Sequence, residues 1–312
     1  MPVCRSDLLP NTYHQSPNMG DFVITCLLFS CFLVRAVSTS ILQMARKSRL
    51  SKSCPSKSRP SNMGRKWTQD DVLAYNIKVV YQDLTTFFGV IDLPPPDVAN
   101  DAITAPDYST AKNDFWACAM LSQMENLLDP DSNHSREHQT IDFIIALFNV
   151  LGYLDVAKRR QTTLRPNLRY LASQGRPPVL DICLRDDLDS GAIILVVKVH
   201  KHTREFDPEP RLISDAIAAF HNDNIRRMKD LGTDPIASKV MPGIVMDGSM
   251  PTFYKIPVTP ELVRAVESGK RPEQETVLYA CRPEVPRPEQ FMKPLDNRYI
   301  ILSCYEAFKH FM

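Results

Sequence analysis

Apolar side chains recur at helical spacing in three stretches of the chain. Within residues 108–128 the apolar side chains fall on one helical face, at Trp116, Met120, Met124 and Leu127. The polar run DPDSN ends this pattern. Residues 141–151 repeat the i, i+3, i+4, i+7 spacing, and Gly152 stands where a C-terminal cap is expected. Residues 208–222 open with Pro and Glu, which suit a helix start. We therefore predict three amphipathic helices.

Shorter apolar runs predict strands between and after these helices. Residues 179–184 and 192–199 are separated by the turn-rich run RDDLDSG, which is typical of a β-hairpin. Another short apolar run precedes the hairpin at residues 164–171. Further strand candidates follow at residues 251–258, 276–281 and 298–302. The order helix, strand, hairpin, helix, strand predicts a mixed α/β fold.

Composition is that of an ordinary globular protein. The 312 residues are 44% hydrophobic and 23% charged, and the net charge of +1 gives no global attraction to polyanions. Gly-rich nucleotide motifs are missing, and the pair Gly243 and Gly248 lacks the lysine that a phosphate loop requires. A small-molecule substrate is therefore not expected. The eight cysteines form no C-x-x-C pair, which favours a reducing compartment over a disulfide scaffold.

The chain divides into three parts. Residues 1–45 contain an uncharged apolar run of 13 residues at 22–34, shorter than a bilayer requires. Residues 46–66 hold eight basic residues and no acid, which predicts a disordered tether or a phosphate-binding arm. Residues 67–312 are expected to form a single α/β domain. We expect the protein in the nucleus or cytoplasm; the alternative is a single-pass membrane or secreted protein directed by residues 1–45.

Two groups of residues could carry chemistry. His134, Glu137 and His138 form the pattern H-x-x-E-H, which can bind zinc, but no third ligand is marked downstream and the run is polar. Asp181 lies on one strand of the predicted hairpin, and Lys201 follows the next. A metal-dependent nuclease needs carboxylates to hold Mg²⁺ and a lysine to stabilise charge at one edge of a sheet.

The runs LDICL, ILVVKVHK and DPEPRLISDAIAAF, in this order, resemble the PD-(D/E)XK nuclease superfamily, which has the restriction-endonuclease-like fold. The run PTFYKIPVT after the AIAAF helix is similar to a group of its members in mushroom-forming fungi. The resemblance covers residues 108–285. It implies a mixed sheet flanked by helices, preceded by a disordered N-terminal region.

The resemblance also implies site residues. Asp181 matches the metal ligand and catalytic Asp of the superfamily, and Lys201 matches its catalytic Lys. The acid expected two positions before the lysine is Val199, or Val196 if Lys198 is the matching lysine. Aliphatic side chains offer Mg²⁺ no oxygen. Carboxylates from neighbouring helices are the candidates for a relocated ligand: Glu209, Asp215, Glu137 and Asp142.

Three hypotheses follow from these patterns. The first is a nuclease-like protein that is catalytically degenerate, with Mg²⁺ as the cofactor of any active form. The second is a non-catalytic module that binds nucleic acid or protein, using residues 46–66 and the basic stretch at Arg226, Arg227 and Lys229. The third is the membrane-tethered or secreted protein already described. Arg211 also stands where relatives often have Gln, which alters the expected substrate contacts.

Overall fold

The computed structural model describes residues 67–129, 135–154, 157, 159–166, 168, 180–188, 191–201 and 207–312, all within the compact unit Ser58–Met312. The predictions for residues 1–45 and 46–66, and for His134, lie outside these residues. Among the helices described, none combines the length and apolar character needed to cross a membrane.

A seven-stranded open sheet forms the centre of the fold, in the order β1-β7-β6-β5-β4-β3-β2. Its strands are β1 Ile77–Tyr81, β2 Arg160–Leu164, β3 Ile182–Asp186, β4 Ala192–Val199, β5 Lys239–Asp247, β6 Met250–Val258 and β7 Thr276–Cys281. Neighbouring strands are antiparallel except for the parallel pairs β1–β7 and β4–β5. The mixed α/β class predicted from the sequence is therefore confirmed.

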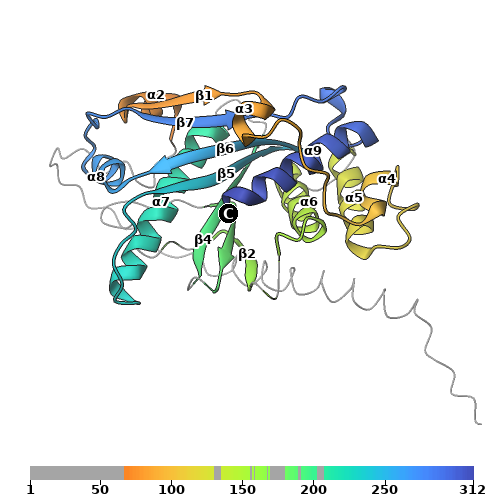
Figure 1. Ribbon diagram of the computed structural model, residues 1–312, viewed down its shortest axis with the longest axis horizontal. Coiled ribbons are helices and arrows are strands. Elements are labelled where there is room, and N and C mark those ends of the chain that lie inside the picture. Colours follow the sequence, from red (N-terminus) through yellow and green to blue (C-terminus); the bar gives the residue numbers. More distant parts are fainter. Residues whose placement is uncertain are drawn as a thin grey trace, which may run out of the picture. The chain divides into compact units, whose positions relative to one another are not determined.

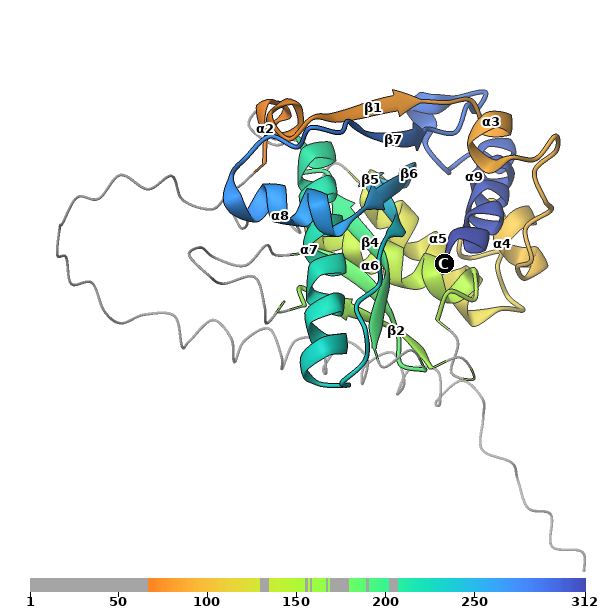
Figure 2. The same ribbon diagram turned by 60° about the vertical axis from the view of Figure 1, so that its left-hand side comes forward.

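Helices cover both faces of the sheet (Figure 1). They are α2 Gln69–Ala74, α3 Leu84–Phe88, α4 Asn100–Thr104, α5 Phe115–Leu128, α6 Arg136–Val150, α7 Pro208–Lys229, α8 Pro260–Ser268 and α9 Leu295–Phe308, with short 3-10 helices at Pro288–Gln290 and Lys309–Phe311. Figure 2 shows α7 and α8 on one side of the strands and α4, α5 and α9 on the other. Each face has its own apolar core, and alternate residues of the central strands contribute to one or the other.

The structure confirms most of the predicted elements. The three predicted helices correspond to α5, α6 and α7, and the predicted hairpin is β3–β4. Ser135 and Asp207 cap the starts of α6 and α7 by accepting backbone N–H groups. Gly152, just after α6, has a φ of 66°, which glycine adopts without strain.

The strand predicted at residues 298–302 is wrong, because these residues lie within α9. A run as short as RYIIL does not by itself distinguish a strand from a buried helix. The buried residues of α9 continue at helical spacing beyond that run, through Tyr305 and Phe308.

Arg298, in the first turns of α9, is fully buried. Its guanidinium donates hydrogen bonds to backbone carbonyl oxygens of Met292 at 3.2 Å, Lys293 at 3.1 Å and Ala105 at 2.6 Å. Burial lowers the pKa of Arg298 to about 10. Because these acceptors come from the loop after α4 and the loop before α9, Arg298 ties the two segments together.

We expect Arg298→Met to lower the free energy of unfolding by about 3 kcal/mol, because it leaves several buried carbonyl oxygens without a donor. Urea unfolding followed by circular dichroism measures the change. Arg287→Met is the control, since its ion pair with Asp296 is exposed and its loss should cost less than about 1 kcal/mol. Equal losses for the two variants would contradict the assigned role of Arg298.

Candidate functional site

The candidate site lies where the parallel strands β4 and β5 end and α7 begins. The chain leaves β4, forms α7 and returns through β5, which is parallel to β4. In open α/β sheets, ligand sites form at the carboxyl ends of parallel strands beside the starts of the connecting helices. The residues predicted from the sequence lie in or next to the elements that meet in this region. Asp181 and Lys201 flank the hairpin β3–β4, and Glu209 and Asp215 belong to α7.

Four charged residues form what we call the buried charge cluster: Asp181, Lys198, Arg211 and Asp215. The Nζ of Lys198 lies 2.8 Å from Oδ2 of Asp215 and 3.5 Å from Oδ1 of Asp181. Asp181, Lys198 and Asp215 are each no more than 5% exposed. The other carboxylate oxygen of Asp181 accepts the backbone N–H of Val199 at 3.0 Å.

Register and helix spacing explain why these residues meet. Ile182 pairs with Val197, so Asp181 stands beside Lys198 on the neighbouring strand. Side chains alternate along β4, and Val196 packs in the core beneath α7 while Val197 and Val199 pack in the opposite core. Lys198 therefore projects toward α7. Arg211 and Asp215 are four residues apart, which places them on one face of that helix.

In the buried charge cluster, burial and the attraction between opposite charges shift the pKa values in opposite directions. Burial lowers the pKa of Lys198, but Asp215 and Asp181 outweigh it and raise that pKa above its ordinary value. Burial raises the pKa of Asp215 to about 6, against the opposing attraction of Lys198 and Arg211. Burial also lowers the pKa of Arg211, which interacts with Asp181 and Asp215. The cluster thus combines two cationic and two acidic side chains.

The contact expected between Asp181 and Lys201 is not made. Asp181 pairs with Lys198, whereas the Nζ of Lys201 donates to Oε1 of Glu137 at 2.8 Å. Arg165 binds the same oxygen of Glu137 at 3.2 Å. Lys201 and Arg165 both lower the pKa of Glu137, although burial acts in the opposite direction. Glu137, the acid of the H-x-x-E-H pattern, is therefore engaged by two cations.

Glu209 belongs to a different group of side chains. Its Oε2 accepts hydrogen bonds from the hydroxyls of Tyr81 at 2.7 Å and Tyr254 at 2.9 Å. Burial raises the pKa of Tyr81 to about 12, and burial together with Glu209 raises the pKa of Tyr254 strongly. This contact could not be predicted from the sequence, because the two tyrosines come from β1 and β6, far from Glu209 along the chain.

These residues fit a catalytic Mg²⁺ poorly. Mg²⁺ keeps several waters and needs oxygen ligands that it can reach. Asp181 and Asp215 are buried and share Lys198, and the position two before Lys198 holds the buried, apolar Val196. Across the part of the chain that the structure describes, no three His, Cys, Asp or Glu side chains converge to hold a metal ion. What the arrangement does is join α7 to β3 and β4.

We expect Lys198→Met to lower the free energy of unfolding by about 3–5 kcal/mol, because it leaves two carboxylates buried without their shared cation. Lys201→Met is the matched control: its ion pair is partly exposed and should be worth less than about 1 kcal/mol. Urea unfolding near neutral pH compares the two. Similar small losses would show that the buried charge cluster does not hold α7.

The raised pKa of Asp215 predicts a dependence of stability on pH. The folded protein holds this proton more tightly than the unfolded chain, so the contribution of Asp215 is fully present below pH about 4 and is lost as the pH rises through about 6. We expect a loss of roughly 2–3 kcal/mol across this window from this group. Asp215→Asn should remove that part of the slope in urea unfolding at several pH values. An unchanged slope in Asp215→Asn would refute the assignment.

Comparison with known proteins does not assign the chain to a family. No protein-family model matches the chain, and no curated protein matches its sequence.

Proposed function

We propose that residues 67–312 form a restriction-endonuclease-like core that has lost phosphodiester hydrolysis, and that the chain binds nucleic acid without cutting it. The buried charge cluster carries the first part of the proposal. The succession α6, β2, β3, β4, α7, β5 supports the relationship, because it contains the order helix, strand, hairpin, helix, strand, although β2 shares only Leu164 with the run predicted at residues 164–171 and β5 was not predicted.

The contacts of Lys198 and Arg211 support the proposed loss of hydrolysis. Lys198 satisfies both Asp181 and Asp215, and Arg211 balances the remaining negative charge. Mg²⁺ would have to displace a buried ammonium from two carboxylates without gaining a third oxygen from Val196. The cluster is suited to holding the fold together rather than to activating water.

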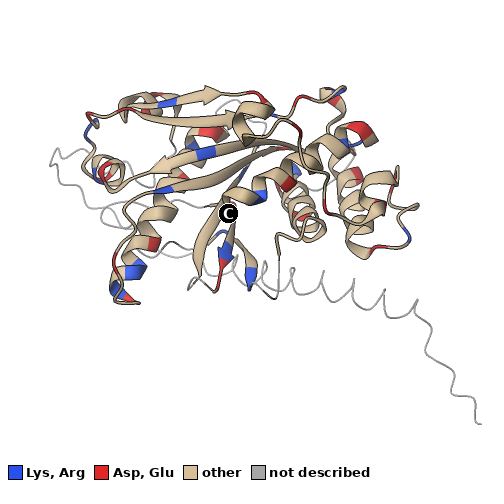
Figure 3. Ribbon diagram, viewed as in Figure 1, with Lys and Arg blue, Asp and Glu red and all other residues tan. Residues whose placement is uncertain are grey.

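Nucleic-acid binding is supported by charge outside the buried charge cluster. Residues 46–66 carry eight basic residues and no acid, a density that favours contacts with phosphates. Figure 3 shows a second basic group at the C-terminal end of α7, formed by Arg226, Arg227 and Lys229. Basic segments of this kind bind a backbone without requiring catalysis.

A cleavage assay tests the first part of the proposal. Labelled single- and double-stranded DNA and RNA are incubated with the full chain and Mg²⁺ or Mn²⁺, and we expect no metal-dependent product. Asp181→Ala, checked for folding by circular dichroism, is the control that identifies contaminating nucleases. Cleavage by the wild-type protein that disappears in folded Asp181→Ala would overturn the proposal.

Fluorescence anisotropy over a range of salt concentrations tests the second part. We expect the logarithm of the binding constant to fall linearly with the logarithm of salt, with a slope of about −0.9 for each phosphate neutralised in duplex DNA. Four substitutions in the basic segment should make this slope shallower: Lys47→Ser, Arg49→Ser, Lys52→Ser and Lys57→Ser. The charge-matched control is Lys112→Ser, Arg264→Ser, Lys270→Ser and Lys293→Ser. No binding, or an equal effect of both sets, would contradict binding through residues 46–66.

A further inference from the structure

Strands β6 and β7 separate after a short paired stretch. Their pairing covers only Phe253 with Cys281, Tyr254 with Ala280, and Lys255 with Tyr279. Beyond it, residues 256–258 remain paired with β5 and residues 276–278 with β1, but the two segments do not pair with each other. The sheet therefore has an internal opening between β6 and β7.

Pro257 explains why the ladder stops. Continuing the register by two residues would place Pro257 opposite Val277. The N–H of Thr276 donates to Asn76 on the β1 side, so the N–H and C=O of Val277 point toward β6, because backbone groups alternate along a strand. Proline has no N–H to give to Val277 and cannot complete that pair. The backbone groups that face the opening, and that a third strand could bind, are therefore the N–H and C=O of Val277 and the C=O of Pro257.

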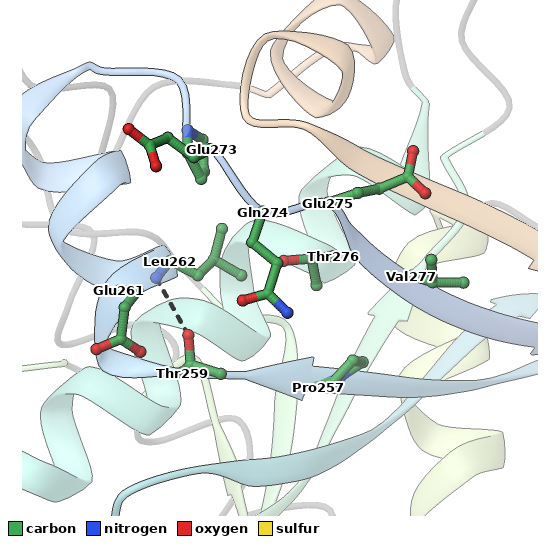
Figure 4. Close-up of a pocket in the computed structure, with 10 residues that line it drawn as sticks. Pro257, Thr259, Glu261, Leu262, Glu273, Gln274, Glu275, Thr276 and Val277 are labelled. Carbon is green, nitrogen blue, oxygen red and sulfur yellow. Dashed lines mark hydrogen bonds between the residues drawn. The ribbon is translucent and has the colours of Figure 1, made fainter.

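Pockets lie on both faces of this opening, and Pro257 lines both. One has a volume of about 550 Å³ and is bordered by the start of α8 and the loop before β7 (Figure 4). The other, of about 340 Å³, is lined by Val240, Lys255 and Tyr279 among others. Val240 and Tyr279 belong to the exposed large hydrophobic residues of the protein. A strand in the opening would direct alternate side chains into the two pockets.

The larger pocket is acidic. Glu261, Glu273 and Glu275 line it, and no Lys or Arg is among its lining residues. Figure 4 shows Glu261 and Glu273 on the same side of the pocket, and Gln274 reaching from the loop toward the end of β6. Gln274 is exposed, so its side chain can turn into solvent at little cost. The exposed ion pair of Glu261 with Arg264 is also weak enough to exchange for another cation.

We propose that this opening is a docking site for an extended segment of another protein, which adds as a strand between β6 and β7. Its alternate residues are Lys or Arg, facing Glu261 and Glu273, and apolar residues, facing Val240 and Tyr279. Strand addition of this kind takes affinity from backbone hydrogen bonds and specificity from the pockets for alternate side chains. The inference is independent of the proposed function, because it uses neither the buried charge cluster nor residues 46–66.

A labelled peptide of alternating Lys and Val, eight residues long, is the probe, and fluorescence anisotropy with the full chain is the measurement. We expect binding that weakens about tenfold or more in the double variant Glu261→Gln/Glu273→Gln, since two charge contacts are lost. Glu284→Gln/Glu289→Gln is the matched control and should bind as the wild type does. No binding to the wild type, or equal weakening in both double variants, would overturn the proposal.

Two further comparisons test strand addition itself. N-methylation of alternate backbone nitrogens of the peptide should abolish binding, because it removes donors to the strand edges. Pro257→Val restores the missing N–H, so it should extend the β6–β7 ladder, raise the melting temperature and weaken peptide binding. Unchanged affinity for the methylated peptide, or in Pro257→Val, would rule out insertion between the strands.

The variant with four serines in residues 46–66 tests the source of the segment. If the natural occupant comes from another protein, this variant binds the Lys-Val peptide as the wild type does. An affinity about tenfold higher in the variant would instead show that the chain's own basic segment competes for the opening, and would overturn the assignment to a partner.

Discussion

The fold depends on a lysine ammonium held between two buried carboxylates. Lys198 reaches from the centre of the sheet to Asp181, just before β3, and to Asp215 on α7, so one side chain links the hairpin β3–β4 to the helix that covers it. A buried charge is tolerated only when its partners are close and well placed. Arg211 supplies the second cation, and the four charges balance. Any ligand that removed Lys198 from this position would also loosen α7.

The balance of charges around Lys198 differs from what a metal-dependent nuclease needs. In a metal-dependent nuclease, carboxylates at a sheet edge must remain open to a divalent cation and to water. Here the carboxylate of Asp181 contacts the ammonium of Lys198, and Val196 offers no oxygen. The carboxylate of Glu137 forms ion pairs with Lys201 and Arg165. These contacts favour stability over hydrolysis at the sheet edge that we propose to be related to a nuclease site. This is the physical basis for proposing binding without cleavage.

Local periodicity predicted part of the fold but not α8 or α9, and the tertiary contacts of the site were not predicted. The helical faces of α5, α6 and α7 and the hairpin β3–β4 follow from spacing and turn residues. Strand β5 was missed because Pro242 and Gly243 interrupt its pattern; a Cβ on Gly243 would lie 3.0 Å from Leu212 of α7, so glycine lets the helix pack closely on the strand. Asp181 was predicted as a metal ligand and catalytic residue beside Lys201; the structure places it beside Lys198 instead, and its role stays a prediction. Only the register between β3 and β4 shows that Lys198, rather than Lys201, stands beside it.

A crystal structure of the full chain grown with Mn²⁺, with anomalous data collected at the manganese absorption edge, shows directly what lies between Asp181 and Asp215. We expect the Nζ of Lys198 between the two carboxylates, with no anomalous peak beside either. A manganese ion bound by both carboxylates, with Lys198 displaced, would contradict this expectation and restore a metal-dependent reaction as the explanation of the site.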